Sequence, residues 1–205
     1  LYLTSQAQID SFQVLYPNCT EIEGDVHIGG PDIANLDGLN QLASIGGNLI
    51  IGSSTYGGNP ALTSIEGLSA LNNISGNLKI GQNYALDNLV GLQGIEILNG
   101  SIGIENNALS SLIGLNNLIS ISGNLVVAGN YNHTNLNGLS NLTSVEGNLT
   151  IIDNDSMSNL EGLEGINSIE GSLDIYDNIA LTTLTGLDNL TSIGGNLRVG
   201  DYGTY

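Results

Sequence analysis

A unit of about 24 residues recurs along the chain and limits the possible folds more than any other feature of the sequence. Each unit holds a glycine, then a small polar residue, then two apolar residues separated by one position. The glycines are Gly24, Gly47, Gly76, Gly100, Gly123, Gly147, Gly171 and Gly195. Alternation with a period of two at a fixed place predicts one short strand per unit. We therefore predict an all-β fold: a right-handed parallel β-helix, or leucine-rich-repeat solenoid, of about eight coils that bury their apolar residues against one another.

The N-terminal end departs from this unit. Ser5 and Gln8 form a capping-box pattern, and apolar residues follow at helical spacing, so we predict a short helix over about residues 5–15. No helix is expected inside the unit itself, because glycine, asparagine and β-branched residues recur there.

The C-terminal end shows no such capping pattern. Residues 1–20 are predicted to form an N-terminal capping segment with the short helix, and residues 21–205 the solenoid repeats. Leu197 and Val199 form the last predicted strand, and no cap follows them. An uncovered coil exposes unpaired backbone groups and apolar area. We therefore expect this end to be open and regard it as the candidate assembly end.

Charge narrows the classes of function. The chain has 205 residues, with 20 Asp or Glu and 2 Lys or Arg, and its formal net charge is −18. So few cations argue against nucleic acid and against an anionic membrane surface as partners. No run of 18 apolar residues is present, so no membrane insertion is expected.

The cysteine content and the start of the sequence indicate the setting. Cys19 has no partner for an internal disulfide, and the absence of an initial Met or leader is typical of a processed or excised piece. These features favour a secreted, extracellular protein in a cation-rich medium.

Residues 18–28 (NCTEIEGDVHI) resemble the opening of a receptor L domain, the leucine-rich β-helix of insulin-type and EGF-type receptors. The Gly-Asn-Leu-x-Ile rungs and residues 59–62 (NPAL) are similar to the same family. The units resemble most closely the tandem leucine-rich units of secreted bacterial surface proteins. The resemblance implies a right-handed β-helix that binds or assembles at the cell surface without catalysis. The receptor domains carry more cysteines than the single Cys19 of this chain.

An asparagine column repeats outside the apolar positions. It lies three residues before the first leucine-type position of the next unit, at Asn59, Asn83, Asn106, Asn130, Asn154 and Asn178. Stacked side-chain amides can bond to turn backbone and to one another. We interpret this column as a structural ladder.

Tyrosines gather in the loops after the strands, at Tyr56, Tyr84, Tyr131, Tyr176 and Tyr202. A ridge of Tyr and Asn along one edge offers large contact area with polar tips, which favours binding of a glycan or a protein. The alternative is scattered surface tyrosine without a role. An insertion within residues 52–61 is expected to protrude from the same edge.

Acidic residues also stack. Asp153, Asp177 and Asp201 recur at intervals of 24 residues, and Asp155 adds a fourth carboxylate. Stacked like charges destabilise a sheet, and Ca²⁺, which binds oxygen ligands, would relieve the repulsion. A calcium site at these four residues is one hypothesis. The alternative is that the side chains extend into solvent and are screened by salt. No other cofactor is expected.

Several asparagines lie in Asn-x-Ser/Thr sequons and are candidate glycosylation sites. They are Asn18, Asn73, Asn99, Asn132, Asn141, Asn148, Asn154 and Asn189. Three of them, Asn141, Asn148 and Asn189, also follow from the Asn-Leu-Thr sequence of the repeat itself.

Enzyme chemistry has little support in the sequence. His27 is expected in the first strand and His133 in a loop of a distant unit, and neither has the neighbours of a zinc site or a catalytic triad. We expect a non-enzymatic extracellular or cell-surface module with one of two roles. The first is a structural subunit that assembles end to end with further copies or adjacent domains, as a fibre or stalk. The second is an adhesion or recognition module that binds a glycan or protein through the Tyr/Asn edge.

Overall fold

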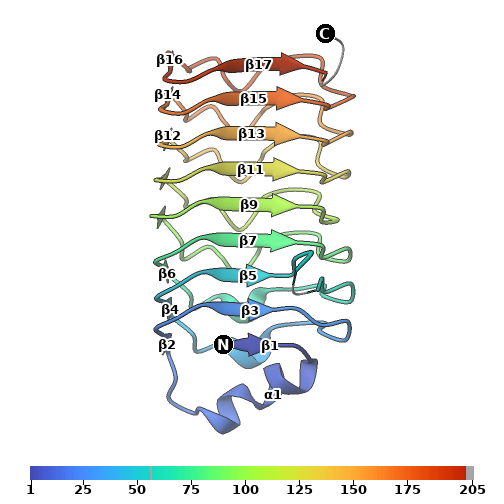
Figure 1. The fold of residues 1–205 in the computed structure, drawn as a ribbon, viewed down its shortest axis with the longest axis vertical. Helices are drawn as coiled ribbons and strands as arrows, with labels where there is room; N and C mark the ends of the chain where they lie inside the picture. The colour runs from blue at the N-terminus through green and yellow to red at the C-terminus, as the bar shows by residue number, and fades with distance from the viewer. Residues whose placement is uncertain (56, 202–205) are drawn as a thin grey trace.

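The computed structural model describes residues 1–55 and 57–201 and confirms the parallel β-solenoid (Figure 1). Nine parallel strands form the widest sheet, in the order β1-β3-β5-β7-β9-β11-β13-β15-β17. Their bounds are β1 (Tyr2–Leu3), β3 (Val26–Ile28), β5 (Leu49–Ile51), β7 (Leu78–Gly81), β9 (Ile102–Glu105), β11 (Leu125–Ala128), β13 (Leu149–Ile152), β15 (Leu173–Tyr176) and β17 (Leu197–Gly200). The eight strands from β3 to β17 each begin one coil, numbered here from 1 to 8.

A second wall is built from shorter strands, which corrects the prediction of one strand per unit: in the described residues, coils 1 to 7 each contain one long and one short strand. One parallel sheet contains β2 (Glu21–Ile22), β4 (Ser44–Ile45) and β6 (Asn73–Ile74). The other contains β8 (Ile97–Leu98), β10 (Ser120–Ile121), β12 (Ser144–Val145), β14 (Ser168–Ile169) and β16 (Ser192–Ile193). The expectation that the unit holds no helix needs one correction: coils 1 and 2 contain the 3-10 turns η1 (Asp37–Leu39) and η2 (Glu66–Leu68).

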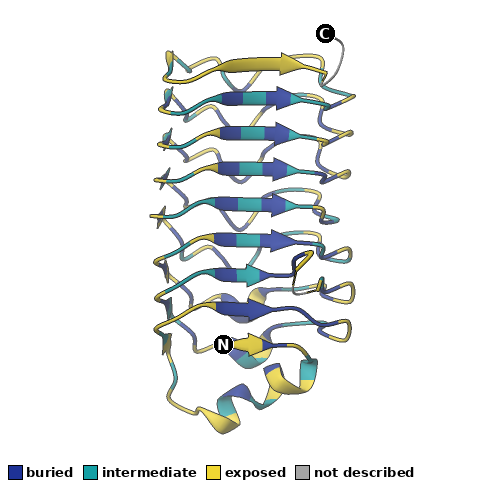
Figure 2. Cartoon of the chain, in the orientation of Figure 1, coloured by how far each residue is buried: buried dark blue, intermediate teal, exposed yellow. Residues whose placement is uncertain are grey.

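The core follows from the register. Equivalent residues of successive coils pair directly, as Leu149 with Leu173 and Ile151 with Ile175, so inward leucines and isoleucines form continuous buried columns. Figure 2 shows buried and partly exposed positions alternating along the strands of coils 3 to 7. Each coil therefore buries its apolar face against its neighbours, as in other solenoids.

The predicted N-terminal helix is present as α1 (Gln6–Leu15). The Ser5 side chain accepts a hydrogen bond from the Gln8 N–H at 3.4 Å, as an N-cap residue does. The Gln8 side chain differs from a capping box, because its Oε1 accepts from the Thr4 N–H at 2.7 Å instead of from the N-cap residue. Ile9 and Phe12 are buried and pack into the first coil, so α1 covers this end of the core.

Close contact between coils explains one of the repeated glycines. Gly114 has a φ of +118°, and a Cβ at this position would overlap the backbone carbonyl of Leu89 in the preceding coil. The equivalent Gly138 and Gly162 meet the same obstacle at Leu112 and Leu136. Only glycine combines this φ with so close an approach of two backbones.

Candidate functional site

The C-terminal end of the coil stack is open. Among the described residues, β17 pairs with β15 alone. Leu197 and Val199 are 61% and 45% exposed, whereas the equivalent Leu173 and Ile175 of β15 are 2% and 1% exposed. Figure 2 shows this difference as the change from β15 to an exposed β17. Leu197 and Val199 lie in β17, the last strand of the described residues, and their role as an assembly end stays a prediction.

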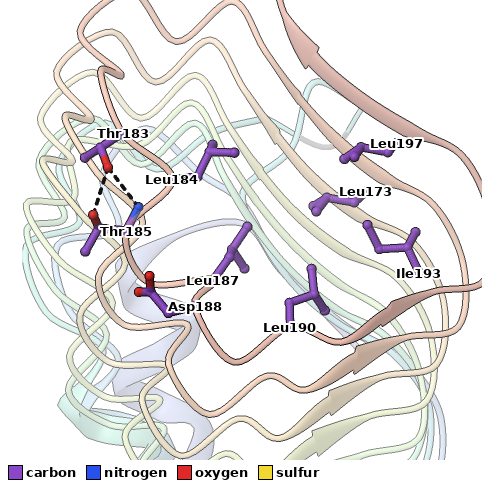
Figure 3. A pocket seen from close by; sticks show the side chains of 9 residues that line it. All are labelled: Leu173, Thr183, Leu184, Thr185, Leu187, Asp188, Leu190, Ile193 and Leu197. Atoms are coloured by element: carbon purple, nitrogen blue, oxygen red, sulfur yellow. Dashed lines mark hydrogen bonds between the residues drawn. The ribbon is translucent and has the colours of Figure 1, made fainter.

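A hollow of about 410 Å³ lies at this open end. Figure 3 shows apolar side chains arranged around it, among them those of Leu184, Leu187, Leu190, Ile193 and Leu197. The polar groups beside it bond to one another: the Thr185 N–H donates to Thr183 Oγ1 at 3.2 Å, and the Gly186 N–H to Asp188 Oδ2 at 3.1 Å. The surface that remains to be covered is therefore mainly apolar.

A ladder of small polar side chains also leads to this end. It stands just before each long strand of the coils, at Asp25, Asn48, Asn77, Ser101, Asn124, Asn148, Ser172 and Asn196. The side-chain oxygen of one member accepts the backbone N–H of the next, as Asn148 Oδ1 does from Ser172 at 2.7 Å and Ser172 Oγ from Asn196 at 3.0 Å. Asn196 is the last member, so its side-chain oxygen lies where the N–H of a further coil would bind.

The opposite end is covered by α1 but also exposes apolar side chains. Val14, Leu15 and Tyr16 are 81%, 65% and 54% exposed. The sequence before Lys79 contains carboxylates but no Lys or Arg, so this end is acidic. The open end carries Arg198, whose side chain is 63% exposed and whose Nε lies 3.7 Å from Asp174 Oδ1. The two ends of the solenoid thus differ in covering, whereas both carry more carboxylates than cations.

The asparagine ladder is confirmed with one member corrected. Its amides bind neighbouring coils, as when Asn83 Nδ2 donates to the Ile51 carbonyl at 2.9 Å and to Asn107 Oδ1 at 3.0 Å. In coil 4 the ladder residue is Asn107, which is 4% exposed, and not Asn106, which is exposed and has a φ of +55°. The turn that follows is one residue shorter than in the neighbouring coils. Counting back from the next leucine therefore selected the wrong asparagine.

The predicted tyrosine ridge divides into separate places. Tyr84 and Tyr131 directly follow the ladder residues Asn83 and Asn130, and they are 61% and 57% exposed. Tyr176 lies instead at the end of β15 and is half-buried. Tyr56 and Tyr202 lie outside the described residues. Two of the five tyrosines therefore share one edge, and their role in binding stays a prediction.

The acidic column has a backbone explanation. Asp153 and Asp177 both have a φ of +55°, at the turn after the strand where Gly129 has a φ of +64°. Aspartate, asparagine and glycine tolerate this left-handed region better than other residues. Among the described residues, which include Asp155 and Asp201, no group of three or more His, Cys, Asp or Glu is arranged to hold a metal ion. Calcium binding by Asp153, Asp155, Asp177 and Asp201 stays a prediction.

The sequons differ in accessibility. Asn154 is fully buried in the ladder, where its Nδ2 donates to the Val127 carbonyl at 2.9 Å, so the folded chain has no room for a glycan on it. The exposed sequon asparagines are Asn18, Asn73, Asn99, Asn132, Asn141, Asn148 and Asn189. Their modification stays a prediction.

The two histidines occupy unrelated environments. His27 stacks on Tyr2 with a centroid distance of 4.6 Å, and its Nε2 lies 3.9 Å from Asp25 Oδ2. The Asn48 backbone N–H holds the pKa of Asp25 below its usual value. His133 was expected in a loop, but it is fully buried in the core of coil 5. Burial lowers the pKa of His133 to about 4, against a smaller opposing effect of the Ser111 backbone. Neither histidine belongs to a nucleophile or metal arrangement in the described residues.

A stack of parallel coils with a helix over one end and an apolar hollow at the other defines the chain as a β-solenoid module. The Receptor L domain family model matches residues 18–108 and 141–205, and the chain belongs to this family. Domains of this family are typically extracellular and non-catalytic. Comparisons with curated proteins and with solved structures gave no match.

Residues 109–140, between the two matched segments, continue the same solenoid. Within them, β10 and β11 pair in register with strands on both sides.

None of the described helices has the length and the hydropathy to cross a bilayer.

Proposed function

We propose that this chain is a non-enzymatic scaffold module that assembles end to end, its open coil covered by a further copy or by an adjacent domain. The observation that carries the proposal is the exposure of Leu197 and Val199 at positions that are buried in the preceding coil. Every contact between successive coils in the chain buries these columns. A surface of the same pattern is therefore suited to receive another solenoid end.

The distribution of exposed apolar residues favours a head-to-tail contact. At the open end these residues are Leu184, Leu197 and Val199, and at the helical end Val14, Leu15 and Tyr16. Because the two surfaces differ, the contact is heterologous, and repeated contacts of this kind give an open filament.

The same proposal includes where the assembly is located. A net charge of −18 is best tolerated where cations are abundant, and the family is typically extracellular. We place the assembly at the cell surface or in the surrounding medium, as a fibre or stalk.

Aspartate substitutions at the two ends test this assembly. Val199→Asp and Val14→Asp should each leave the protein monomeric, because a charge would then be buried in the contact. An equimolar mixture of the two variants should form dimers and nothing longer, since each variant keeps one intact end. Sedimentation velocity over a range of concentrations measures all three samples.

A matched control is Ile113→Asp, at an apolar residue that is 48% exposed on the side of coil 4. This variant should assemble like the unchanged protein. Val199→Asp samples that assemble normally would refute the open coil as the contact. A mixture that stays monomeric would refute the head-to-tail arrangement.

A second role, recognition of a ligand, is supported by a different observation. Tyr84 and Tyr131 are exposed on one edge of the solenoid, away from both ends. Exposed tyrosines with polar neighbours are common at recognition surfaces. A recognition function at this edge is compatible with assembly, because the two use different surfaces.

A further inference from the structure

Tyr84 and Tyr131 occupy the same position of the same turn in two different coils. Each follows a ladder asparagine, and each turn closes with a hydrogen bond to that asparagine's carbonyl, from the Leu86 N–H at 3.1 Å and from the His133 N–H at 3.1 Å. The two tyrosines therefore belong to one column, and both are more than half exposed.

The intervening coil lacks a bulky side chain in this column. Its ladder residue Asn107 is followed by Ala108, and its turn is one residue shorter. Because neighbouring rungs lie about 4.8 Å apart, two rungs separate the tyrosines along the solenoid axis by about 9.6 Å. The edge thus presents two aromatic side chains, and the coil between them carries only the small side chain of Ala108 at the same position.

This spacing matches a particular ligand geometry. In an extended β-1,4-linked glycan, successive sugars are turned about the chain, and alternate sugars present the same face at intervals of one disaccharide. That interval is close to the distance of two rungs. We propose that a neutral β-1,4-linked glycan lies along the solenoid axis over this edge, with alternate sugars on Tyr84 and Tyr131. The proposal rests on the recognition role above and names its ligand class.

The charge of the edge selects a neutral chain. Asp155 follows in the same column one coil after Tyr131, and the whole chain carries a net charge of −18, so uronic acids and sulfated sugars would be repelled. Polar groups for sugar hydroxyls are at hand: Asn106 is exposed beside Asn107, and Asn132 is held next to Tyr131 by its Nδ2 bond to the Ala108 carbonyl at 3.0 Å.

Titration calorimetry with cellohexaose, chitohexaose and mannohexaose tests the proposal. These oligosaccharides, the mannohexaose being the β-1,4-linked isomer, share the linkage but differ in the substituent or the configuration at C2, so they also show which neutral glycan is preferred. At least one should bind. Because two stacked positions span three sugars, the matching trisaccharide should bind better than the disaccharide. The α-1,4-linked maltohexaose, which is not extended in this way, should bind weakly or not at all.

Alanine variants localise the site. Tyr84→Ala and Tyr131→Ala should each lower the affinity by about three- to tenfold, and the double variant should abolish measurable binding. Ile113→Ala, at an apolar residue outside this column that is 48% exposed, is the control and should bind normally. The chain has no Trp, so changes in tyrosine fluorescence report the contact independently.

Three outcomes would overturn the proposal: no binding of any of the three hexasaccharides, binding that is unchanged in the double tyrosine variant, or preference for an acidic glycan. Loss of a protein partner from the double variant without any glycan binding would also overturn it. None of these results affects the assembly proposal, whose variants leave both tyrosines in place.

Discussion

At the scale of single residues, His133 is the least expected side chain of the core. It occupies the position that Leu62, Leu86 and Leu109 hold in other coils. It is fully buried, and neither ring nitrogen makes a hydrogen bond of regular geometry. A buried polar group without such a bond costs stability. We therefore expect this residue to weaken the fold and to make its stability depend on pH.

His133→Leu should raise the free energy of unfolding by about 1–3 kcal/mol at neutral pH. The folded-state pKa of about 4 lies below the ordinary value of 6.5, so the unfolded chain takes up the proton first as the pH falls. The stability present above pH 6.5 is therefore lost progressively toward pH 4, by about 3 kcal/mol in total. Urea unfolding at a series of pH values measures this loss of stability. The loss between pH 6.5 and pH 4 should be smaller by about 3 kcal/mol in His133→Leu.

Met157→Leu is the control for this slope, since Met157 is buried at the same place in the next coil. It should leave the pH dependence unchanged. Equal slopes in the unchanged protein and in His133→Leu would contradict the buried neutral state of His133.

The same scale shows where reasoning from the sequence succeeds and fails. The period of the repeat identifies most of the ladder asparagines, because both the strand and the next leucine keep their distance from them. At Asn106 and Asn107 the turn is shorter by one residue, and the two reference points disagree. The position relative to the strand determines which asparagine is the ladder residue, since the buried amides must bond to the strands around them. The burial of His133 was missed because a polar residue at a leucine position gives no periodic signal.

At the scale of elements, the distance between coils is set by backbone contacts that only glycine permits. Gly114→Ala adds a Cβ where the Leu89 carbonyl already lies and keeps an unfavourable positive φ. This change should lower the free energy of unfolding by about 3 kcal/mol or more. Gly24→Ala is the matched control, because a Cβ there meets nothing within 4 Å, and it should change stability by less than about 0.5 kcal/mol. Similar unfolding midpoints for the two variants would contradict this packing.

The elements also show what periodicity leaves out. The long strands were predictable, because two alternating apolar residues mark each of them. The short strands of the second wall carry one strong apolar position each, such as Ile121 of β10, which is too little for a period of two. The first strand, β1, lies outside the repeat, and its pairing with β3 depends on tertiary packing of the N-terminal segment.

At the scale of the whole molecule, the solenoid is a rod with unlike ends, and its carboxylates are spread along its whole length. Lys79 pairs with Glu105 at 3.1 Å on the side of the rod, and Arg198 remains at the open end. The fold class was predictable, because it follows from the repeat. The partner that covers the end was not, because a repeat motif describes contacts between coils and not the identity of the next chain.

Electron microscopy of the purified protein, with and without a calcium chelator, tests end-to-end assembly most directly. Eight rungs at about 4.8 Å span about 38 Å, so we predict filaments with an axial repeat slightly longer than this, to include the helix. Loss of these filaments on chelation would support calcium at Asp153, Asp155, Asp177 and Asp201, and their persistence would argue against it. Isolated short rods at every concentration would contradict assembly from copies of this chain.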